Sequence, residues 1–246
     1  MENIEAEKVE MEGIKSEKKE QEAIAANSKI VVYDDPKSPA AEAYRSIRTS
    51  IQFANIDQTV KTIAITSSKA AEGKTTVAAN LAASLSLLGN KVAIIDCDFR
   101  KPSVHRIFGV SNKKGVTDIL LSHDEDDYGG YIRKIVGSDI DIITAGQIPS
   151  NPSEILSSKS MKSFLRILRE NYDYVMIDTP PVGIVTDASV ISSYIDGVIV
   201  VCNSGQVEIG MAKAAKQNLE KVNARILGIV LNNFKSETSK SSYYYE

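Results

Sequence analysis

The sequence lacks the residues on which disulfide-rich and metal-cluster proteins depend. Tryptophan is absent, and there are only two cysteines and two histidines among 246 residues. Cys97 and Cys202 both lie inside apolar runs, which is typical of reduced, buried thiols rather than of a disulfide framework. Their spacing does not match that of iron–sulfur ligands, so cluster chemistry is excluded. His105 and His123 are isolated in the sequence and are better explained as surface or partly packed residues than as metal ligands.

Long apolar runs and a strong charge of one sign are also missing. No apolar run approaches the ~20 residues that a membrane-spanning helix needs, and the opening MENIEAEKVE does not resemble a signal peptide. If the protein works at a membrane, another protein must bring it there. The net charge of −3 gives no overall basic surface, so we expect no nucleic-acid partner.

What is present is a globular composition with a regular alternation of strands and helices. Hydrophobic side chains make up 43% of the sequence and charged ones 25%. Continuous β-branched runs separated by amphipathic segments predict an α/β fold, with a mostly parallel sheet covered by helices on both faces. The predicted strands are 62–68, 92–96, 140–146, 174–178, 197–202 and 226–232, and the predicted helices are 74–88, 153–171 and about 208–222.

Composition divides the chain into three parts. Residues 1–30 form a charged arm, whose first 25 positions hold eight Glu and four Lys and cannot bury enough apolar surface to offset the ordering entropy. A single domain of residues 31–233 follows. Residues 234–246 form a flexible, tyrosine-rich tail.

A helix is predicted at about 39–53, directly after a proline-containing stretch. Glu42, Arg45 and Arg48 are spaced three residues apart and therefore share about a third of the circumference of this helix. These charged residues either form a contact surface or are simply a solvated helix face.

The segment TIAITSSKAAEGKTTVAANLA has the strand–loop–helix order of a phosphate-binding loop. Backbone N–H groups in such a loop and at the helix N-terminus bind phosphate oxygens, and the helix dipole adds to the attraction. Lys74 can reach the β- and γ-phosphates, and the Thr75 hydroxyl can ligate Mg²⁺. Ser68 occupies the position of the first glycine in the usual motif. The predicted nucleotide-binding residues of the loop are Ser68, Lys69, Ala70, Ala71, Glu72, Gly73, Lys74, Thr75 and Thr76.

Three aspartates lie at the ends of predicted strands. Asp96 and Asp98 leave the strand 92–96 on the same side, and Asp178 ends the strand 174–178. Because neighbouring parallel strands end at one edge of the sheet, all three should converge on the phosphate loop. Several carboxylates beside a helix N-terminus are unfavourable unless a cation intervenes, and Mg²⁺ bound with ATP would provide it.

The motifs DCDFRKP, GQIPSNPSEIL and IDTPP together resemble the bacterial tyrosine kinases of capsule and exopolysaccharide assembly, in their cytoplasmic form. The resemblance runs from about Ser38 to the tyrosine tail. SPAAEAYRSIRTSIQF is similar to the family's E-x-x-R-x-x-R oligomerisation helix, here Glu42, Arg45 and Arg48. The resemblance implies a P-loop NTPase fold related to MinD and ParA, and an ATP-dependent protein-tyrosine kinase.

The resemblance also implies roles for the charged residues. Lys74 and Thr75 would hold phosphates and metal, Asp96 would be the base toward the tyrosine hydroxyl, and Asp98 and Asp178 would organise Mg²⁺ and its waters.

Three further residues receive roles from the resemblance. Arg100 and Lys101 would steady phosphate charge, and Asn232 would contact adenine. The implied partners are further copies of the chain, in an oligomer such as a ring, and the cytoplasmic tail of a membrane activator. This activator would recruit the cytoplasmic protein to the inner face of the membrane.

The tail carries three consecutive tyrosines, Tyr243, Tyr244 and Tyr245, on a polar segment that cannot bury them. Behind a phosphoryl-transfer site, this cluster is predicted to be autophosphorylated and reset by a tyrosine phosphatase. The 11 residues from Asn232 to Tyr243 reach at most ~36 Å when extended, whereas the domain's radius of gyration should be about 16 Å. The tail can therefore reach a neighbouring copy. The alternative is an aromatic tail that docks for stability.

The main alternative function is a MinD/ParA-type ATPase switch, which hydrolyses ATP without phosphorylating protein. Lys69 lies five residues before Lys74, where that class carries its signature lysine. Against this alternative, the loop reads KAAEGKT rather than KGGxGKT, and the class needs neither DxDxRKP nor a tyrosine tail. A nucleotide-bound scaffold without significant turnover is a further alternative.

Overall fold

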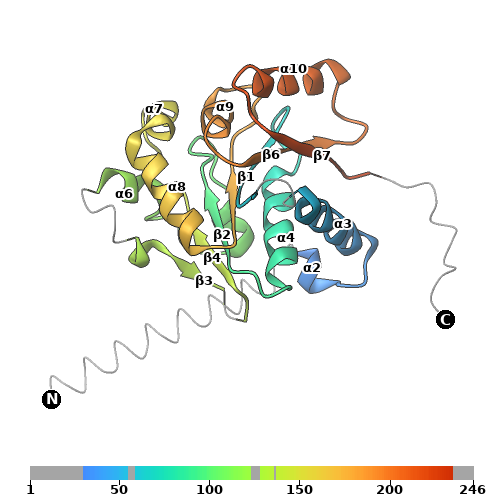
Figure 1. Ribbon diagram of the computed structural model, residues 1–246, viewed down its shortest axis with the longest axis horizontal. Coiled ribbons are helices and arrows are strands. Elements are labelled where there is room, and N and C mark those ends of the chain that lie inside the picture. Colours follow the sequence, from blue (N-terminus) through green and yellow to red (C-terminus); the bar gives the residue numbers. More distant parts are fainter. Residues whose placement is uncertain (1–29, 55–58, 123–127, 136, 235–246) are drawn as a thin grey trace, which may run out of the picture.

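The computed structural model describes residues 30–54, 59–122, 128–135 and 137–234 (Figure 1). Within these residues, a sheet of seven strands has the order β3-β4-β2-β5-β1-β6-β7. Neighbouring strands pair in parallel except for β3, which runs antiparallel to β4 at one edge. The strands are β1 (Thr62–Ser67), β2 (Val92–Asp96), β3 (Arg133–Lys134), β4 (Ile140–Ile143), β5 (Tyr174–Asp178), β6 (Gly197–Asn203) and β7 (Ile226–Asn232).

Helices cover both faces of the sheet, and the five strands β1, β2, β4, β5 and β6 are buried at every residue. Strands buried on both faces must be apolar throughout, which is why they read as continuous Val and Ile runs in the sequence. One face carries the core around α2 (Val31–Asp34), α3 (Pro39–Ala54), α4 (Lys74–Ser86) and α5 (Val104–Phe108). The other carries α6 (Val116–Leu121), α7 (Pro152–Ser157), α8 (Lys159–Asn171), α9 (Asp187–Ser192) and α10 (Ile209–Glu220).

The predicted α/β class and all six predicted strands are confirmed, although β4 ends at Ile143 rather than at 146. The single helix predicted over 153–171 is wrong, because the chain breaks there into α7 and α8. Ser158 has extended backbone at the break, and its hydroxyl accepts a hydrogen bond from the backbone N–H of Met161 at 3.1 Å. A serine that caps the next helix competes with continuation of the previous one.

The helix predicted at 39–53 is α3, which buries Tyr44 and Ile51 against the core that it shares with α4. The regular elements span 31 to 232, so the proposed domain of residues 31–233 stays a prediction compatible with them. Residues 1–29 of the charged arm and the tyrosines of the tail lie outside the described residues. In the part that the structure describes, no helix is both long and apolar enough to cross a membrane.

Candidate active site

The phosphate loop lies between β1 and α4, at the edge of the sheet where the parallel strands end. Gly73 has a φ of 87°, in the left-handed region, and a Cβ at this position would collide with the side-chain amide of Asn232. The Asn232 amide donates a hydrogen bond to the carbonyl oxygen of Glu72 at 2.9 Å. Gly73 therefore permits both the turn into α4 and the close approach of β7 to the loop.

A buried carboxylate holds the phosphate loop from inside. The Glu72 side chain, 1% exposed, accepts hydrogen bonds from the Ser68 hydroxyl at 2.7 Å and from the Lys69 N–H at 2.9 Å. Its other oxygen accepts the backbone N–H of Asn203 at 3.3 Å. Ser68 thus makes a contact that a glycine could not make. The sequence placed Glu72 in the nucleotide site only as a loop residue, with no signal for this bracing role.

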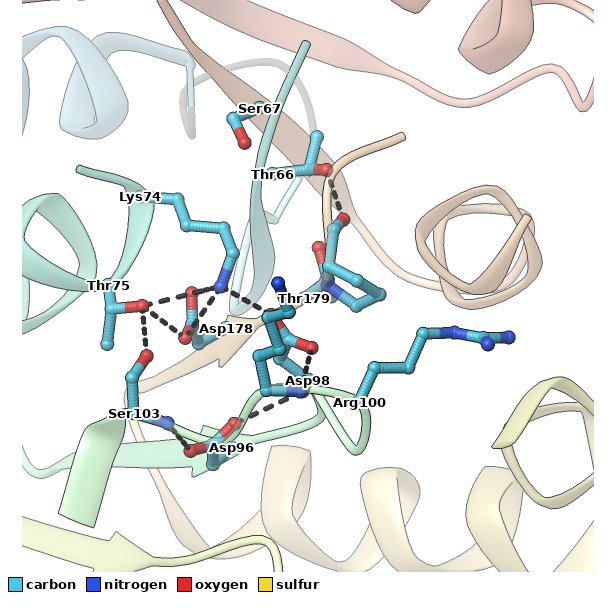
Figure 2. Close-up of polar contacts among 12 residues, drawn as sticks. Thr66, Ser67, Lys74, Thr75, Asp96, Asp98, Arg100, Ser103, Asp178 and Thr179 are labelled. Atoms are coloured by element: carbon cyan, nitrogen blue, oxygen red, sulfur yellow. Dashed lines mark hydrogen bonds and ion pairs between the residues drawn. The ribbon is translucent and has the colours of Figure 1, made fainter. Parts of the chain in front are cut away.

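Lys74 and Thr75 meet the strand-end aspartates at the start of α4. The Lys74 ammonium lies 2.8 Å from Asp98 Oδ2 and 3.3 Å from both carboxylate oxygens of Asp178 (Figure 2). The Thr75 hydroxyl donates to Asp178 Oδ2 at 2.7 Å and lies 2.7 Å from the Ser103 hydroxyl. Three segments far apart in the sequence therefore form one charged cluster.

Burial and charge act against each other within this cluster. Burial lowers the pKa of Lys74, but the charges of Asp178 and Asp98 outweigh that effect and raise it above its ordinary value. Lys74 is therefore a permanent cation. Burial raises the pKa of Asp178, and the charge of Lys74 and the hydrogen bond from Thr75 oppose that rise.

Asp96 lies behind this cluster and is fully buried. One oxygen accepts the N–H of Asp98 at 3.1 Å, and the other accepts that of Ser103 at 2.9 Å (Figure 2). The second oxygen also accepts the N–H of Val104 at 3.0 Å. Burial and the neighbouring charge of Asp178 raise the pKa of Asp96 to about 7, although the backbone N–H groups lower it. Asp96 thus shapes the loop that carries Asp98, and its side chain does not line the adjoining pocket.

A pocket of about 420 Å³ opens beside the phosphate loop, with Lys74, Thr75 and Asp98 at its charged end. Arg100 also lines it, but Figure 2 shows this side chain extending away from the Lys74 cluster. Its guanidinium makes a bidentate pair with Asp187, at 2.8 and 3.1 Å.

The hydrogen bond from Arg100 to Asp187 raises the pKa of the arginine further. Asp187 is fully buried at the start of α9 and also accepts the Ser153 hydroxyl at 2.6 Å. Sequence reasoning missed Asp187. The available signal was Ser153, which lies inside the GQIPSNPSEIL motif.

The oxygen atoms near Lys74 fit a hard divalent cation only in part. Thr75, Asp98 and Asp178 offer a hydroxyl and carboxylates, which Mg²⁺ prefers. Among the described residues, however, no group of three His, Cys, Asp or Glu side chains could hold a metal ion by itself. A metal here would need further oxygens, such as those of nucleotide phosphates.

Two other predicted nucleotide contacts are engaged within the chain. The Lys69 ammonium donates a hydrogen bond to the carbonyl oxygen of Gln206 at 2.6 Å, on the side of β6 and away from the Lys74 cluster. Asn232 bonds the loop backbone, as described above. Both residues therefore border the phosphate loop, and neither contacts the aspartates.

The structure separates the three charged residues of α3. Arg45 pairs with Glu42 at 2.8 Å and also donates to the carbonyl oxygen of Pro36 at the exposed surface. Arg48 instead turns to α4, where it donates to the carbonyl oxygen of Ser84 at 2.7 Å. Arg48 thus has a partner in its own chain, and the role of Glu42, Arg45 and Arg48 in oligomerisation stays a prediction.

The fold and this cluster define the class of protein. A mostly parallel sheet with a phosphate loop after β1 and aspartates at the ends of β2 and β5 is typical of a P-loop NTPase of the MinD and ParA type. The profile of the ParA family, described as NUBPL iron-transfer P-loop NTPase, matches residues 58–244. Iron transfer is part of the printed family description and is not an observation on this chain. Its cysteines, Cys97 and Cys202, are both buried free thiols.

Comparison with individual proteins narrows the class. The chain is 39% identical over 216 residues to the tyrosine-protein kinase YwqD of Bacillus subtilis (strain 168), covering 87% of this chain and 90% of that one. The crystal structure of the chimerical protein CapA2B2 has 40% sequence identity and a TM-score of 0.80, over 84% of this chain and 90% of the other.

A septum site-determining protein MinD from Pyrococcus horikoshii OT3, complexed with Mg-ADP, shares the fold less closely. It has 26% identity and a TM-score of 0.59 over 72% of each chain. The chain belongs to the bacterial tyrosine kinases, as the resemblance of its motifs indicated, and it is a protein-tyrosine kinase.

Proposed function

We propose that this protein is an autokinase that transfers phosphate from ATP to Tyr243, Tyr244 and Tyr245 of a neighbouring copy. The observation that carries the proposal is the charged cluster of Lys74, which opens into a pocket in a chain that ends in a tyrosine cluster. A MinD/ParA-type ATPase switch would need the charged cluster around Lys74 but not the tail tyrosines.

The charged groups suit a loose phosphoryl transfer. Loop N–H groups and Lys74 would hold the β- and γ-phosphates, so that negative charge developing on the transferred oxygens meets a fixed cation. The tyrosine oxygen bonds to the γ-phosphorus as the bond to the β,γ-bridging oxygen breaks, and ADP keeps that electron pair. Mg²⁺, held by Thr75, Asp98 and Asp178 with phosphate oxygens, would neutralise charge on the phosphates.

The tyrosine hydroxyl must also lose its proton. Asp96 is the proposed base, and a pKa of about 7 suits a group that accepts a proton near neutral pH. Because its oxygens now accept three backbone N–H groups, the loop from Asp98 to Ser103 must shift before a substrate can reach it. Asp98, which lines the pocket, is the carboxylate that a substrate meets without such a shift.

The wider role rests on the family resemblance. We infer regulation of capsule or exopolysaccharide synthesis and export, with recruitment to the membrane by the cytoplasmic tail of an activator. The assembly would be a homo-oligomer such as a ring, and a tyrosine phosphatase would reset it. Arg45, at the exposed surface of α3, supports a role of this helix in contacts between copies.

Incubation with Mg²⁺ and labelled ATP, followed by mapping of the labelled residue, tests the activity. Label on the tail tyrosines is the expected result. Release of free phosphate without labelled tyrosine would instead identify an ATPase switch, and neither product would identify a nucleotide-bound scaffold. Trans action is tested by mixing a Lys74→Met protein with an active copy whose three tail tyrosines are Phe. Label must then appear on the inactive copy.

A further inference from the structure

The pocket beside the phosphate loop is lined by apolar side chains as well as by Lys74, Thr75 and Asp98. Its larger apolar lining residues come from two segments, the chain after β5 and the helix α5. Pro181 and Ile184 lie on the first segment, and Ile107 lies on the second. Ile184 is 62% exposed although it is a large aliphatic side chain. Exposed apolar surface inside a pocket is typical of a place where a ligand packs.

Two exposed cations, Lys101 and Arg106, line the same pocket. Among the described residues, neither side chain has a carboxylate within salt-bridge distance, in contrast to Arg100, which is paired with Asp187. The pocket lining therefore combines two cations without an ion-pair partner in the described part of the chain, apolar side chains and the phosphate-binding residues.

A tyrosine followed by an acidic residue matches all three kinds of lining residue: apolar, cationic and phosphate-binding. The aromatic ring requires apolar contact along its length, and its hydroxyl lies at the far end, where it would face the γ-phosphate. A serine hydroxyl lies next to the backbone and could not reach past such apolar side chains. In the sequence SSYYYE, Glu246 directly follows the tyrosines and offers the charge that Lys101 and Arg106 lack.

We propose that Ile107, Pro181 and Ile184 form the slot for the acceptor tyrosine, and that Lys101 and Arg106 bind the acidic residue that follows it. The occupant is the tail of a second copy, because the 12 residues after Phe234 can span between adjoining copies. This inference rests on the proposed kinase activity and adds the basis of its selectivity for tyrosine.

The test uses the full chain with its own tail tyrosines changed to Phe, so that an added peptide, SETSKSSYYYE, is the acceptor. Ile184→Ser should raise the KM for this peptide about tenfold, as expected for a lost apolar contact, and leave the KM for ATP unchanged. Ile209→Ser is the matched control, since Ile209 is 74% exposed on α10 and does not line the pocket. Because both positions are exposed, both variants should melt like the parent protein.

The charge contact has its own test. Arg106→Glu should raise the KM for SETSKSSYYYE, and a peptide with Lys in place of the final Glu should recover most of the loss. Arg166 is an exposed arginine on α8, and Arg166→Glu should change the KM for neither peptide. Unchanged peptide KM values in Ile184→Ser and Arg106→Glu would overturn the proposed acceptor slot but leave the proposed autokinase activity intact. A parent protein that labels neither the peptide nor a wild-type tail overturns both.

Discussion

The ammonium nitrogen of Lys74 lies 2.8 Å from Asp98 and 3.3 Å from Asp178, so the first residue of α4 joins the ends of β2 and β5. Both carboxylates are almost completely buried, and among the described residues Lys74 is the cation within salt-bridge distance of them. A phosphate that binds at Lys74 must therefore compete with two carboxylates. This competition favours the joint binding of a nucleotide and a divalent cation, because the cation replaces the charge that the carboxylates lose.

Lys74→Met should abolish tyrosine phosphorylation while the domain stays folded. Removing one charged donor from a transition state costs about 10²- to 10³-fold in rate. Some stability is lost as well, because Asp98 and Asp178 lose their cation. Phosphotyrosine formation and far-UV circular dichroism are the measurements, and Lys216→Met, on the exposed surface of α10, is the control. A variant that keeps more than a small fraction of the wild-type rate would falsify the assignment.

Asp96→Asn should reduce phosphoryl transfer far more than ATP binding, because a base acts on the attacking hydroxyl whereas the loop and metal hold the nucleotide. Single-turnover transfer and ATP affinity are measured side by side. Because the Asp96 oxygens hold three backbone N–H groups, we also expect a stability loss of about 1–3 kcal/mol in urea unfolding. If affinity collapses while the bound complex still transfers phosphate, Asp96 serves the metal and the loop, and Asp98 becomes the candidate base.

Glu72→Ala should weaken ATP binding at least tenfold, because the loop then loses the acceptor that holds Ser68, Lys69 and Asn203. Two or three lost hydrogen bonds of about 1 kcal/mol each account for such an effect. Glu72→Gln keeps one acceptor oxygen, so its ATP affinity should lie between that of Glu72→Ala and that of the wild type. ATP affinity by calorimetry is the measurement. Equal affinities in all three proteins would show that the loop keeps its shape without the brace.

Arg45→Ala and Arg48→Ala together should yield a monomer that phosphorylates its tail poorly at low concentration. The structure predicts different contributions from each residue. Arg48→Ala alone should lower the melting temperature, because it removes the part-buried bond to Ser84, whereas Arg45→Ala, which removes exposed contacts with Glu42 and Pro36, should lower it less. Sedimentation velocity reports assembly, and Arg166→Ala provides a control on another helix. An unchanged oligomer in the double variant would return both arginines to a role within one chain.

Phosphorylation of the tail should loosen the assembly. Each phosphate adds about −1.5 to −2 charge at neutral pH, so three bring roughly −5 toward a neighbour's site that already contains Asp98 and Asp178. Repulsion at such range costs several kcal/mol where screening is incomplete. The phosphorylated protein should sediment mainly as a monomer, and the protein with Phe in place of the tail tyrosines as an oligomer. Identical sedimentation at equal concentration and salt would mean that the tail is a mark and not a switch.

The sequence by itself determined the six parallel strands, but not the short antiparallel strand β3, together with the phosphate loop and the convergence of Asp98 and Asp178 on Lys74. These features follow from local rules: buried parallel strands are continuously apolar, and their ends share one edge. Hydrophobic periodicity and sequence motifs were enough to predict these features, because each rule concerns residues that are neighbours along the chain or on adjacent strands. The break at Ser158 escaped the same reasoning, because an apolar period continues across it and only the serine cap ends it.

The tertiary structure alone decided which polar side chains serve the site and which serve the fold. Arg100 and Asp187 are 87 residues apart, and Arg48 and Ser84 are 36 apart, so no periodicity links them. Asp96 carries the same carboxylate as Asp98 two residues later, yet one turns into the interior and the other into the pocket. A buried polar group needs a hydrogen-bond partner. In these cases the partner comes from a segment far away in the sequence, so it is known only once the chain has packed.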